Sequence, residues 1–342
     1  MANDTINTAT VKSMGNYNGK GVTIVVIDSG IRTTHQEFSN TNILYTWDFV
    51  NNNSDVTDDT VGHGTGVASC IFGNYFTTES WLQAYPTDII PATSSNTLGV
   101  APSANLIFLQ NLSGGGVPDT IASLNAMEWC IANKTKYNIR VVNMSFGLGS
   151  IPNGNSPETK LADKMVDAGI VVVVSAGNAG PGSGTIGTPG DAKNAITVGA
   201  VQDRTTIGLW KFSKASPSMA VFSSRGPTSD GRAKPDVVAP GVSVIVARFG
   251  SDTQYEYTNG TSYSSPYTAG ACALIIQRHP NWHPVHVKQA LIATASPVSG
   301  AGQYDQGAGL INIYRAINYR QPFEGLPIAQ ILKIVKGNQN KE

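Results

Sequence analysis

The sequence predicts an α/β fold: a single domain built on a doubly wound, mostly parallel β-sheet with helices on both faces. Two observations lead to this prediction, namely short β-branched apolar runs and the helical stretches that alternate with them. The first run, residues 21–27 (GVTIVVI), leads into Asp28 and has the continuous apolar character of a strand buried on both faces. Further buried strands are expected over residues 106–109, 140–144, 170–174 and 195–201.

Three helices are expected between or after these strands. In residues 120–132 (TIASLNAMEWCIA), apolar side chains recur every three or four positions, as on one face of a helix. Residues 157–168 form the second helix, with Gly169 as its C-cap. The third, residues 263–279, follows the stretch NGTSYSSP. In a sheet of this kind, ligands bind at the carboxyl ends of the strands, which is where Asp28 stands.

The chain is expected to hold one domain over residues 1–320, because 342 residues can bury one sizeable core. Residues 72–96 are polar and aromatic with few periodic apolar positions, which predicts a surface insertion in that domain. Residues 321–342 are expected to form a C-terminal tail that is either a short docked helix or disordered.

The charge balance argues against nucleic acid as a partner. Lys plus Arg and Asp plus Glu both total 23, and no basic tract is present to pair with phosphates. The longest apolar stretch, residues 169–176, is far shorter than the ~20 residues that cross a bilayer, so membrane insertion is not expected. Residues 1–4 lack the basic and apolar regions of a signal peptide; we expect a mature domain of a secreted protein or, alternatively, a cytoplasmic protein.

Cysteine usage indicates no metal site. Cys70, Cys130 and Cys272 are odd in number and lack the spacing of metal ligands. Free, buried thiols are the simpler interpretation, with one disulfide as the alternative.

Asp28, His63 and Ser262 are candidates for a nucleophilic relay. Acyl transfer by serine needs a hydroxyl, an imidazole near neutral pKa that takes its proton, and a carboxylate that sets the imidazole tautomer. Taken singly, Asp28 and Ser262 could each be a helix cap, and His63 could be an ordinary loop histidine. Glycines on both sides of His63 nevertheless favour an exposed imidazole, which a packed histidine does not require.

Pro266 indicates the start of the helix that follows Ser262. Proline belongs within about the first turn of a helix, where its missing N–H costs no intrahelical bond. Ser262 would then lie at a helix N-terminus, where unpaired N–H groups and the helix dipole favour developing negative charge. Asn178, among glycines after a buried strand, is a second candidate donor for such an oxyanion.

The order Asp, His, Ser along the chain separates the possible folds. α/β-Hydrolases run Ser, acid, His and carry G-x-S-x-G, whereas chymotrypsin-like enzymes run His, Asp, Ser. Here Ser262 follows Gly-Thr, in one of eight short blocks that occur in a recognisable order. The blocks are DSG at Asp28, GHGT at Gly62, NMSFG at Asn143, SAGN at Ser175, SSRGP at Ser223, KPDVVAPG at Lys234, GTS-x-x-x-P at Gly260 and GAGLIN at Gly307. With these blocks the chain resembles the subtilisin-like serine proteases, the subtilases, from about residue 19 to residue 317.

The resemblance implies a serine endopeptidase that acts through an acyl-enzyme and needs no cofactor for its chemistry. It implies Asp28 as the orienting acid, His63 as general base and acid, and Ser262 as the nucleophile. It further implies that Asn178 and the Ser262 N–H form the oxyanion hole. Polypeptides are the expected substrates, and a propeptide or proteinaceous inhibitor is a further partner suggested by the resemblance.

The resemblance also implies where a substrate side chain would lie. Ser145, Phe146 and Gly147 would line one side of the P1 pocket, and Ala176 and Gly177 the other. A peptide bound there as an added strand is recognised through its main chain, so we expect broad specificity, with large apolar P1 side chains favoured.

Several positions depart from the family pattern. Gly66 stands where the family usually has His, and Tyr263 and Tyr267 stand where it usually has Met and His. Leu148 replaces a common second glycine. None of these positions belongs to the proposed triad, so the departures concern the packing around the site and its specificity.

A structural calcium ion is left open by the resemblance. Glu37 falls where an acidic calcium ligand is frequent, but the short loop that usually supplies carbonyl ligands is replaced by the longer segment after Cys70. Calcium needs several oxygens converging at about 2.4 Å. Glu37 is the one candidate metal ligand that the sequence offers.

Other function classes fit less well. A subtilase-fold binding scaffold would be expected to have lost triad residues, yet all three are present. A serine esterase of another fold conflicts with the triad order, and a peptidase with Glu in place of His conflicts with His63 in its expected block. A dinucleotide site at GHGTG is excluded because no G-x-G-x-x-G follows a strand.

Overall fold

The computed structural model describes residues 5–15, 17–57, 59, 61–75, 98–113, 116–147, 154–208 and 211–321. Most of the predicted insertion at residues 72–96 and nearly all of the predicted tail at residues 321–342 lie outside these ranges. The division of the chain into domain, insertion and tail therefore stays a prediction.

A mostly parallel sheet forms the centre of the molecule. Within the described residues, its strand order is β2-β3-β1-β4-β5-β6-β7, and β8 pairs with β6. All pairs are parallel except β6 with β7. The strands are β1 (Thr23–Asp28), β2 (Asn42–Asp48), β3 (Asn105–Gln110), β4 (Ile139–Met144), β5 (Val171–Ser175), β6 (Ile196–Gly208), β7 (Lys211–Met219) and β8 (Val237–Pro240), with β9 (Val244–Ala247) and β10 (Tyr255–Thr258) in a separate antiparallel pair.

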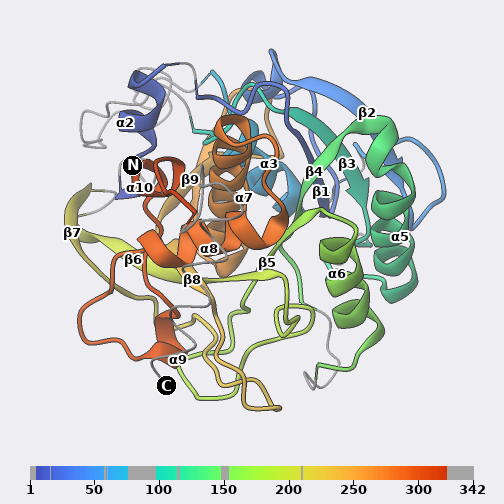
Figure 1. Cartoon of the computed structure of the whole chain (residues 1–342). Helices are drawn as coiled ribbons and strands as arrows, with labels where there is room; N and C mark the ends of the chain where they lie inside the picture. Colours follow the sequence, from blue (N-terminus) through green and yellow to red (C-terminus); the bar gives the residue numbers. More distant parts are fainter. Residues whose placement is uncertain are drawn as a thin grey trace.

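Helices cover both faces of this sheet (Figure 1). On one face lie α3 (His63–Phe72) and α7 (Thr261–Arg278), and on the other lie α5 (Thr120–Tyr137) and α6 (Pro157–Asp167). Alternate residues of β1 point to opposite sides, so that Ile24 and Val26 pack with α3 and α7, whereas Val25 and Ile27 pack with α5 and α6. The predicted doubly wound α/β fold is thus confirmed. The remaining helical elements are α2 (Thr8–Ser13), η1 (Gln36–Phe38), α8 (Pro284–Thr294), α9 (Gln303–Gln306) and α10 (Ile313–Ile317).

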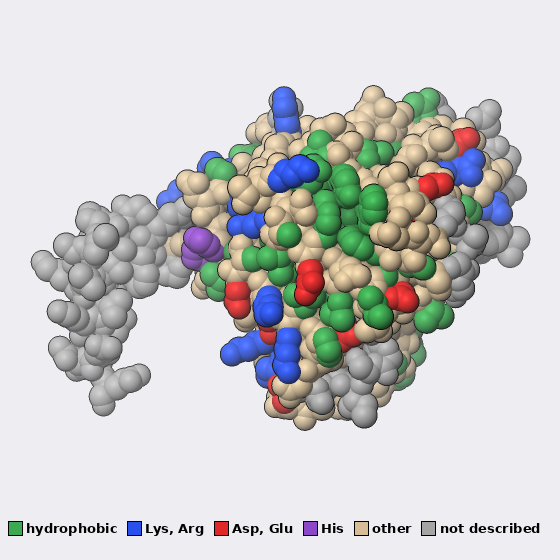
Figure 2. Space-filling view, turned by 90° about the vertical axis from the view of Figure 1, so that its right-hand side faces the viewer, with side chains coloured by type: hydrophobic (Ala, Val, Ile, Leu, Met, Phe, Trp, Pro, Cys, Tyr) green, Lys and Arg blue, Asp and Glu red, His purple; other side chains and the backbone are tan. Residues whose placement is uncertain are grey.

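The side of the molecule formed by α5, α6 and β2 carries many hydrophobic side chains (Figure 2). Half-buried aromatic rings from β2 and α5 stack there, with the ring centroids of Tyr45 and Trp129 only 4.8 Å apart. Trp47 stacks on Tyr45 with a centroid distance of 6.3 Å, and Tyr137 contacts both Tyr45 and Trp129. These contacts hold the edge strand β2 against α5.

The five strands expected from the sequence all form, with ends displaced by at most two residues except at the C-terminal end of β6. That strand continues to Gly208 because it pairs with β7 in an antiparallel hairpin that the apolar pattern does not reveal. The helix expected over residues 120–132 continues to Tyr137 and ends at Asn138, whose left-handed backbone, at φ 51°, closes it. Strands β2, β7, β8, β9 and β10 are not among those predicted from the sequence. β2, β7 and β10 lack a continuous apolar run, whereas β8 (VVAP) and β9 (VIVA) are apolar runs of only four residues that the sequence analysis does not identify.

The helix after Ser262 begins earlier than the sequence predicts. It starts at Thr261 rather than residue 263, so Ser262 lies in its first turn and Pro266 lies in its interior. The expectation that Pro266 stands where its missing N–H costs no helical bond is therefore wrong. Residue 266 would normally donate to the carbonyl of Ser262, and that carbonyl loses its helical partner.

Two further predictions concern the cysteines and membrane insertion. Cys70, Cys130 and Cys272 are free and buried, as the simpler interpretation predicts. Over the described part of the chain, no helix is both long and apolar enough to cross a membrane.

Candidate active site

The carboxyl ends of three central strands converge on the N-termini of α3 and α7. Asp28 ends β1, Ser145 follows β4 by one residue, and Asn178 follows β5 by three. His63 is the first residue of α3 and Ser262 the second residue of α7. The fold therefore brings together residues that are far apart in sequence, at the sheet edge where α/β proteins bind ligands.

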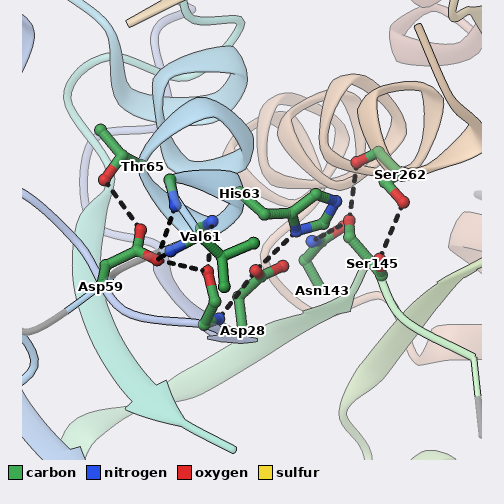
Figure 3. Close-up of polar contacts among 11 residues, drawn as sticks. Asp28, Asp59, Val61, His63, Thr65, Asn143, Ser145 and Ser262 are labelled. Atoms are coloured by element: carbon green, nitrogen blue, oxygen red, sulfur yellow. Dashed lines mark hydrogen bonds and ion pairs between the residues drawn. The ribbon is translucent and has the colours of Figure 1, made fainter. Parts of the chain in front are cut away.

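Asp28 and His63 are in direct contact (Figure 3). Nδ1 of His63 lies 2.7 Å from Oδ1 of Asp28, which also accepts a hydrogen bond from the Ser29 N–H. The Asp28 side chain is fully buried, whereas that of His63 is 22% exposed. The buried carboxylate thus fixes one nitrogen of the ring and leaves the opposite edge accessible.

The two glycines beside His63 have packing roles. Gly62 has a φ of 77°, the left-handed conformation that places His63 at the start of α3. Gly64 lies so close to β1 that a Cβ atom would come within 2.2 Å of the Gly30 carbonyl oxygen. Gly62 therefore supplies a backbone conformation that side chains disfavour, and Gly64 allows the close approach of α3 to the end of β1.

A second buried carboxylate, that of Asp59, organises the same region. Its Oδ1 accepts hydrogen bonds from Ser29 Oγ at 2.9 Å, Gly62 N at 2.8 Å and Val61 N at 3.1 Å. Its Oδ2 accepts from Thr65 Oγ1 at 3.3 Å. Asp59 therefore joins the end of β1 to the first turn of α3, the two elements that carry Asp28 and His63.

Sequence analysis does not single out Asp59. The available signal is an acidic residue upstream of Gly-His-Gly in a loop that contains other aspartates. Only the folded chain shows which of these carboxylates is buried and which donors surround it.

The electrostatics of the site favour a protonated imidazole. Burial lowers the pKa of His63, but the charge of Asp28, the hydrogen bond to Asp28 and the charge of Asp59 together raise it above its ordinary value. Burial raises the pKa of Asp59, against the opposing effect of its hydrogen bonds from Gly62, Ser29 and Val61. Two carboxylates thus stabilise the charge that His63 gains when it accepts a proton.

Ser262 contacts Ser145 at two points. The Ser262 hydroxyl donates to the main-chain oxygen of Ser145 at 2.9 Å, and the Ser145 hydroxyl donates to the main-chain oxygen of Ser262 at 2.8 Å. Figure 3 shows the imidazole of His63 between Asp28 and this pair of serines. In this conformation the hydroxyl of Ser262 is engaged with Ser145, and a rotation about its Cα–Cβ bond is needed to turn it to His63.

Asn178 lies beside the start of α7 with its amide oriented. Its Oδ1 accepts hydrogen bonds from the N–H and the hydroxyl of Thr261, each at 2.9 Å. Since the oxygen is engaged by Thr261, the Nδ2 group is the donor that Asn178 has left for a ligand. Thr261 is thus a further residue of the site that sequence analysis does not identify.

The predicted pocket residues form two short segments after β4 and β5. Phe146 and Ala176 are buried, and Gly147 is exposed. Gly177 donates its N–H to Thr261 Oγ1 at 3.2 Å. The segments therefore flank the start of α7, while the side chain of Ser145 points to Ser262 rather than to a pocket.

Two departures from the family pattern fit each other in space. A Cβ atom on Gly66 would lie 3.3 Å from Cε1 of Tyr263 and 3.2 Å from Cγ2 of Val246. The ring of Tyr263 also lies 5.7 Å from that of His63. The large ring after Ser262 therefore occupies the space beside α3 that the absent side chain at residue 66 leaves.

Glu37, the candidate calcium ligand, is buried among hydrogen-bond donors. The Tyr255 hydroxyl donates to Glu37 Oε1 at 2.6 Å, and the Tyr75 N–H donates to Glu37 Oε2 at 3.2 Å. No group of three His, Cys, Asp or Glu side chains suited to a metal ion occurs among the described residues. These contacts suit a structural carboxylate, and they give no support to the calcium ion that the sequence leaves open.

Comparisons with known proteins agree with this geometry. The model of the "Subtilase family" matches residues 19–314. Serine protease AprX of Bacillus subtilis is 33% identical over 87% of this chain and 66% of its own length. Subtilisin of Bacillus pumilus is 33% identical over 88% of this chain and 92% of its own length.

Solved structures give the same result. Sphericase superposes with a TM-score of 0.70 and 25% identity over 86% of this chain and 92% of its own. A cold adapted subtilisin-like serine proteinase superposes with a TM-score of 0.64 and 26% identity over 87% and 89%. The chain spans 66% of the length of the first curated relatives it matches. It belongs to the subtilase family, the family of subtilisin-like serine endopeptidases.

Proposed function

We propose that this chain hydrolyses peptide bonds as a serine endopeptidase, with Ser262 as nucleophile, His63 as general base and acid, and Asp28 as the orienting acid. The observation that supports the proposal best is the 2.7 Å contact between the buried Asp28 and the partly exposed His63. This contact holds the proton on Nδ1 and leaves Nε2 as the basic nitrogen, which is the tautomer that a general base requires.

The proposed acylation step begins with rotation of the Ser262 hydroxyl from Ser145 O toward His63. Nε2 takes the hydroxyl proton while Oγ bonds to the carbonyl carbon of the substrate. The imidazolium that forms is stabilised by the nearby carboxylates of Asp28 and Asp59, and it then protonates the leaving amine. In the second half of the reaction, water attacks the acyl carbon while His63 takes its proton. His63 then returns a proton to Ser262 Oγ, and the acid product is released.

The negative charge of the tetrahedral intermediate requires donors near the start of α7. The N–H of Ser262 in the first turn of that helix is one such donor, and Nδ2 of Asn178 is the other. The hydrogen bonds from Thr261 to Oδ1 already orient the Asn178 amide, so Nδ2 needs no reorganisation during the reaction.

The two segments flanking α7 suit an extended peptide. Residues 145–147 and 176–177 follow parallel strands, and their main chains can pair with a substrate as an added strand. A substrate N–H that bonds to Ser145 O would replace the Ser262 hydroxyl at that oxygen and free it for His63. Main-chain recognition supports broad specificity, and the buried Phe146 and Ala176 suit a large apolar P1 side chain.

A serine-directed fluorophosphonate tests the proposal. The intact mass of the treated protein is expected to show one adduct, and peptide mapping is expected to place it on Ser262. The Ser262→Ala variant, with an unchanged thermal transition, is expected to show neither the adduct nor peptide hydrolysis. An adduct of equal yield on Ser262→Ala, or substantial peptidase activity in that variant, would refute the assignment.

A further inference from the structure

Because Pro266 has no N–H, the carbonyl of Ser262, the proposed nucleophile, lacks its usual hydrogen-bond donor within α7. In a regular helix the N–H of residue 266 donates to the carbonyl of residue 262. Pro266 is inside α7 and has no N–H, and its ring also crowds that carbonyl. The carbonyl of Ser262 therefore needs a partner from outside the helix.

The hydroxyl of Ser145 is that partner. Ser145 is buried, at 1% exposure, and its Oγ lies 2.8 Å from the Ser262 carbonyl oxygen. The donor reaches across 117 positions of sequence, from the end of β4 to the first turn of α7. Because the buried Ser145 hydroxyl donates its hydrogen to this carbonyl, the hydroxyl is held in one orientation.

The orientation of Ser145 is set by a chain of buried side chains. Asn143 Nδ2 donates to Ser145 Oγ at 2.9 Å, and Asn143 Oδ1 accepts from Ser265 Oγ at 2.7 Å. Asn143 and Ser265 are both fully buried. This series of hydrogen bonds runs from Ser265 of α7 through Asn143 of β4 and Ser145 to the Ser262 carbonyl. It therefore connects the start of α7 to β4.

Strand β4 also pairs directly with the strand that carries Asp28. Asn143 is in register with Val26 of β1, two residues before Asp28. The path from Asp28 to Ser262 thus runs through one pair of parallel strands and two side-chain hydrogen bonds.

We propose that the hydroxyl of Ser145 is a positioning group for the nucleophile. By holding the carbonyl of Ser262 in place of the missing helical N–H, it sets where the Ser262 N–H and Cβ point relative to His63. This inference rests on the proposed function of Ser262, and it assigns to Ser145 a role that differs from lining a substrate pocket.

The two roles predict different kinetics. A positioning group affects every reaction of the Ser262 hydroxyl, including its reaction with a small fluorophosphonate that has no peptide side chains. A pocket residue affects the KM of peptide substrates and leaves the fluorophosphonate rate unchanged.

The test measures the second-order rate of fluorophosphonate labelling, together with kcat and KM for a peptide, in wild type and Ser145→Ala. We expect the labelling rate and kcat to fall about tenfold, which corresponds to ~1.4 kcal/mol, with little change in KM. Ser145→Cys keeps a weak donor and is expected to be intermediate. Ser264→Ala is the matched control, because it removes a buried hydroxyl of α7 that donates to Ala239 O and Pro240 O instead; its labelling rate should stay at the wild-type value.

A double-mutant cycle with Pro266→Ala gives the sharper test. Alanine returns an N–H at residue 266 to the Ser262 carbonyl, so the loss caused by Ser145→Ala should be clearly smaller in that background. This arm also applies if Ser145→Ala alone does not fold, since the double variant has the helical bond restored.

Three results would overturn the proposal: an unchanged labelling rate in Ser145→Ala, a rise in KM alone, or the same loss in both backgrounds. Failure of the proposed function is recognised separately, because wild-type protein would then show no adduct on Ser262.

Discussion

Asp59 offers a way to separate the charge around His63 from the hydrogen bonds that shape the site. Asp59→Asn keeps the size of the side chain and an acceptor oxygen for Ser29, Val61 and Gly62 but removes the negative charge. Asp59→Ala removes both the charge and the acceptors. The two variants are therefore expected to affect different properties.

The stability effect can be worked out from the donors around Asp59. In the alanine variant the amide of Val61, a residue 42% exposed, can find water, whereas the hydroxyls of the buried Ser29 and Thr65 lose an acceptor. A buried donor that loses its acceptor costs about 1–3 kcal/mol, and the Thr65 contact is long. We therefore expect the free energy of unfolding to fall by about 2 kcal/mol. With an unfolding entropy of ~2.1 cal/mol/K per residue, this loss lowers Tm by about 3 °C for a chain of 342 residues.

The asparagine variant should be close to wild type in stability. The pKa of Asp59 is raised in the folded protein, so the folded state binds the proton more tightly than the unfolded state does. Ionisation of Asp59 therefore costs stability as the pH rises from its ordinary pKa through the raised value. Asparagine does not ionise, and the removal of this cost offsets its weaker hydrogen bonds.

The activity effect appears in the pH profile. His63 must be neutral to accept a proton, so kcat/KM rises with pH through the pKa of His63. The charge of Asp59 contributes to raising that pKa, and Asp59→Asn should move the acid limb of the profile to lower pH. The assay is kcat/KM for one peptide from pH 5 to 9, and Asp55→Asn is the control, since Asp55 is exposed and bonds to Thr57.

The reasoning is refuted if the acid limb of Asp59→Asn stays in place or moves to higher pH, because His63 would then not sense the charge of Asp59. A Tm of Asp59→Ala equal to that of wild type would refute the structural part, since the four hydrogen bonds would contribute nothing.

Two further predictions concern the oxyanion donor and the packing beside His63. Asn178→Ala is expected to lower kcat about 10²–10³-fold at nearly constant KM, the loss known for such a donor in a subtilisin; a change in KM alone would contradict an oxyanion role. Gly66→Ala places a methyl group against Val246 and Tyr263 and is expected to cost about 1–3 kcal/mol of stability and to lower kcat. Adding Tyr263→Met should recover part of both, as measured by Tm and peptide hydrolysis, whereas additive losses would mean that the two positions do not compete for space.

Much of the fold and the candidate triad can be predicted from the sequence because their signals are local. The run GVTIVVI predicts a buried strand by its composition alone, and Asp28 follows at the strand end where ligands bind. The short motifs around Asp28, His63 and Ser262 can be recognised for the same reason, because the residues of each motif lie within a few positions of one another. The ends of helices are less certain, as the start of α7 at Thr261 and the interior position of Pro266 show.

The tertiary structure alone decides which side chains meet across the sheet. The selection of Asp59 among the nearby aspartates, the bond from Ser145 Oγ to the Ser262 carbonyl and the fit of Tyr263 beside Gly66 all join segments far apart in sequence. Periodicity and composition report whether a residue is buried and on which face, but they carry no information on the atom that lies opposite. That pairing depends on the packing of α3 and α7 against the sheet, and it is there that the geometry of the site is determined.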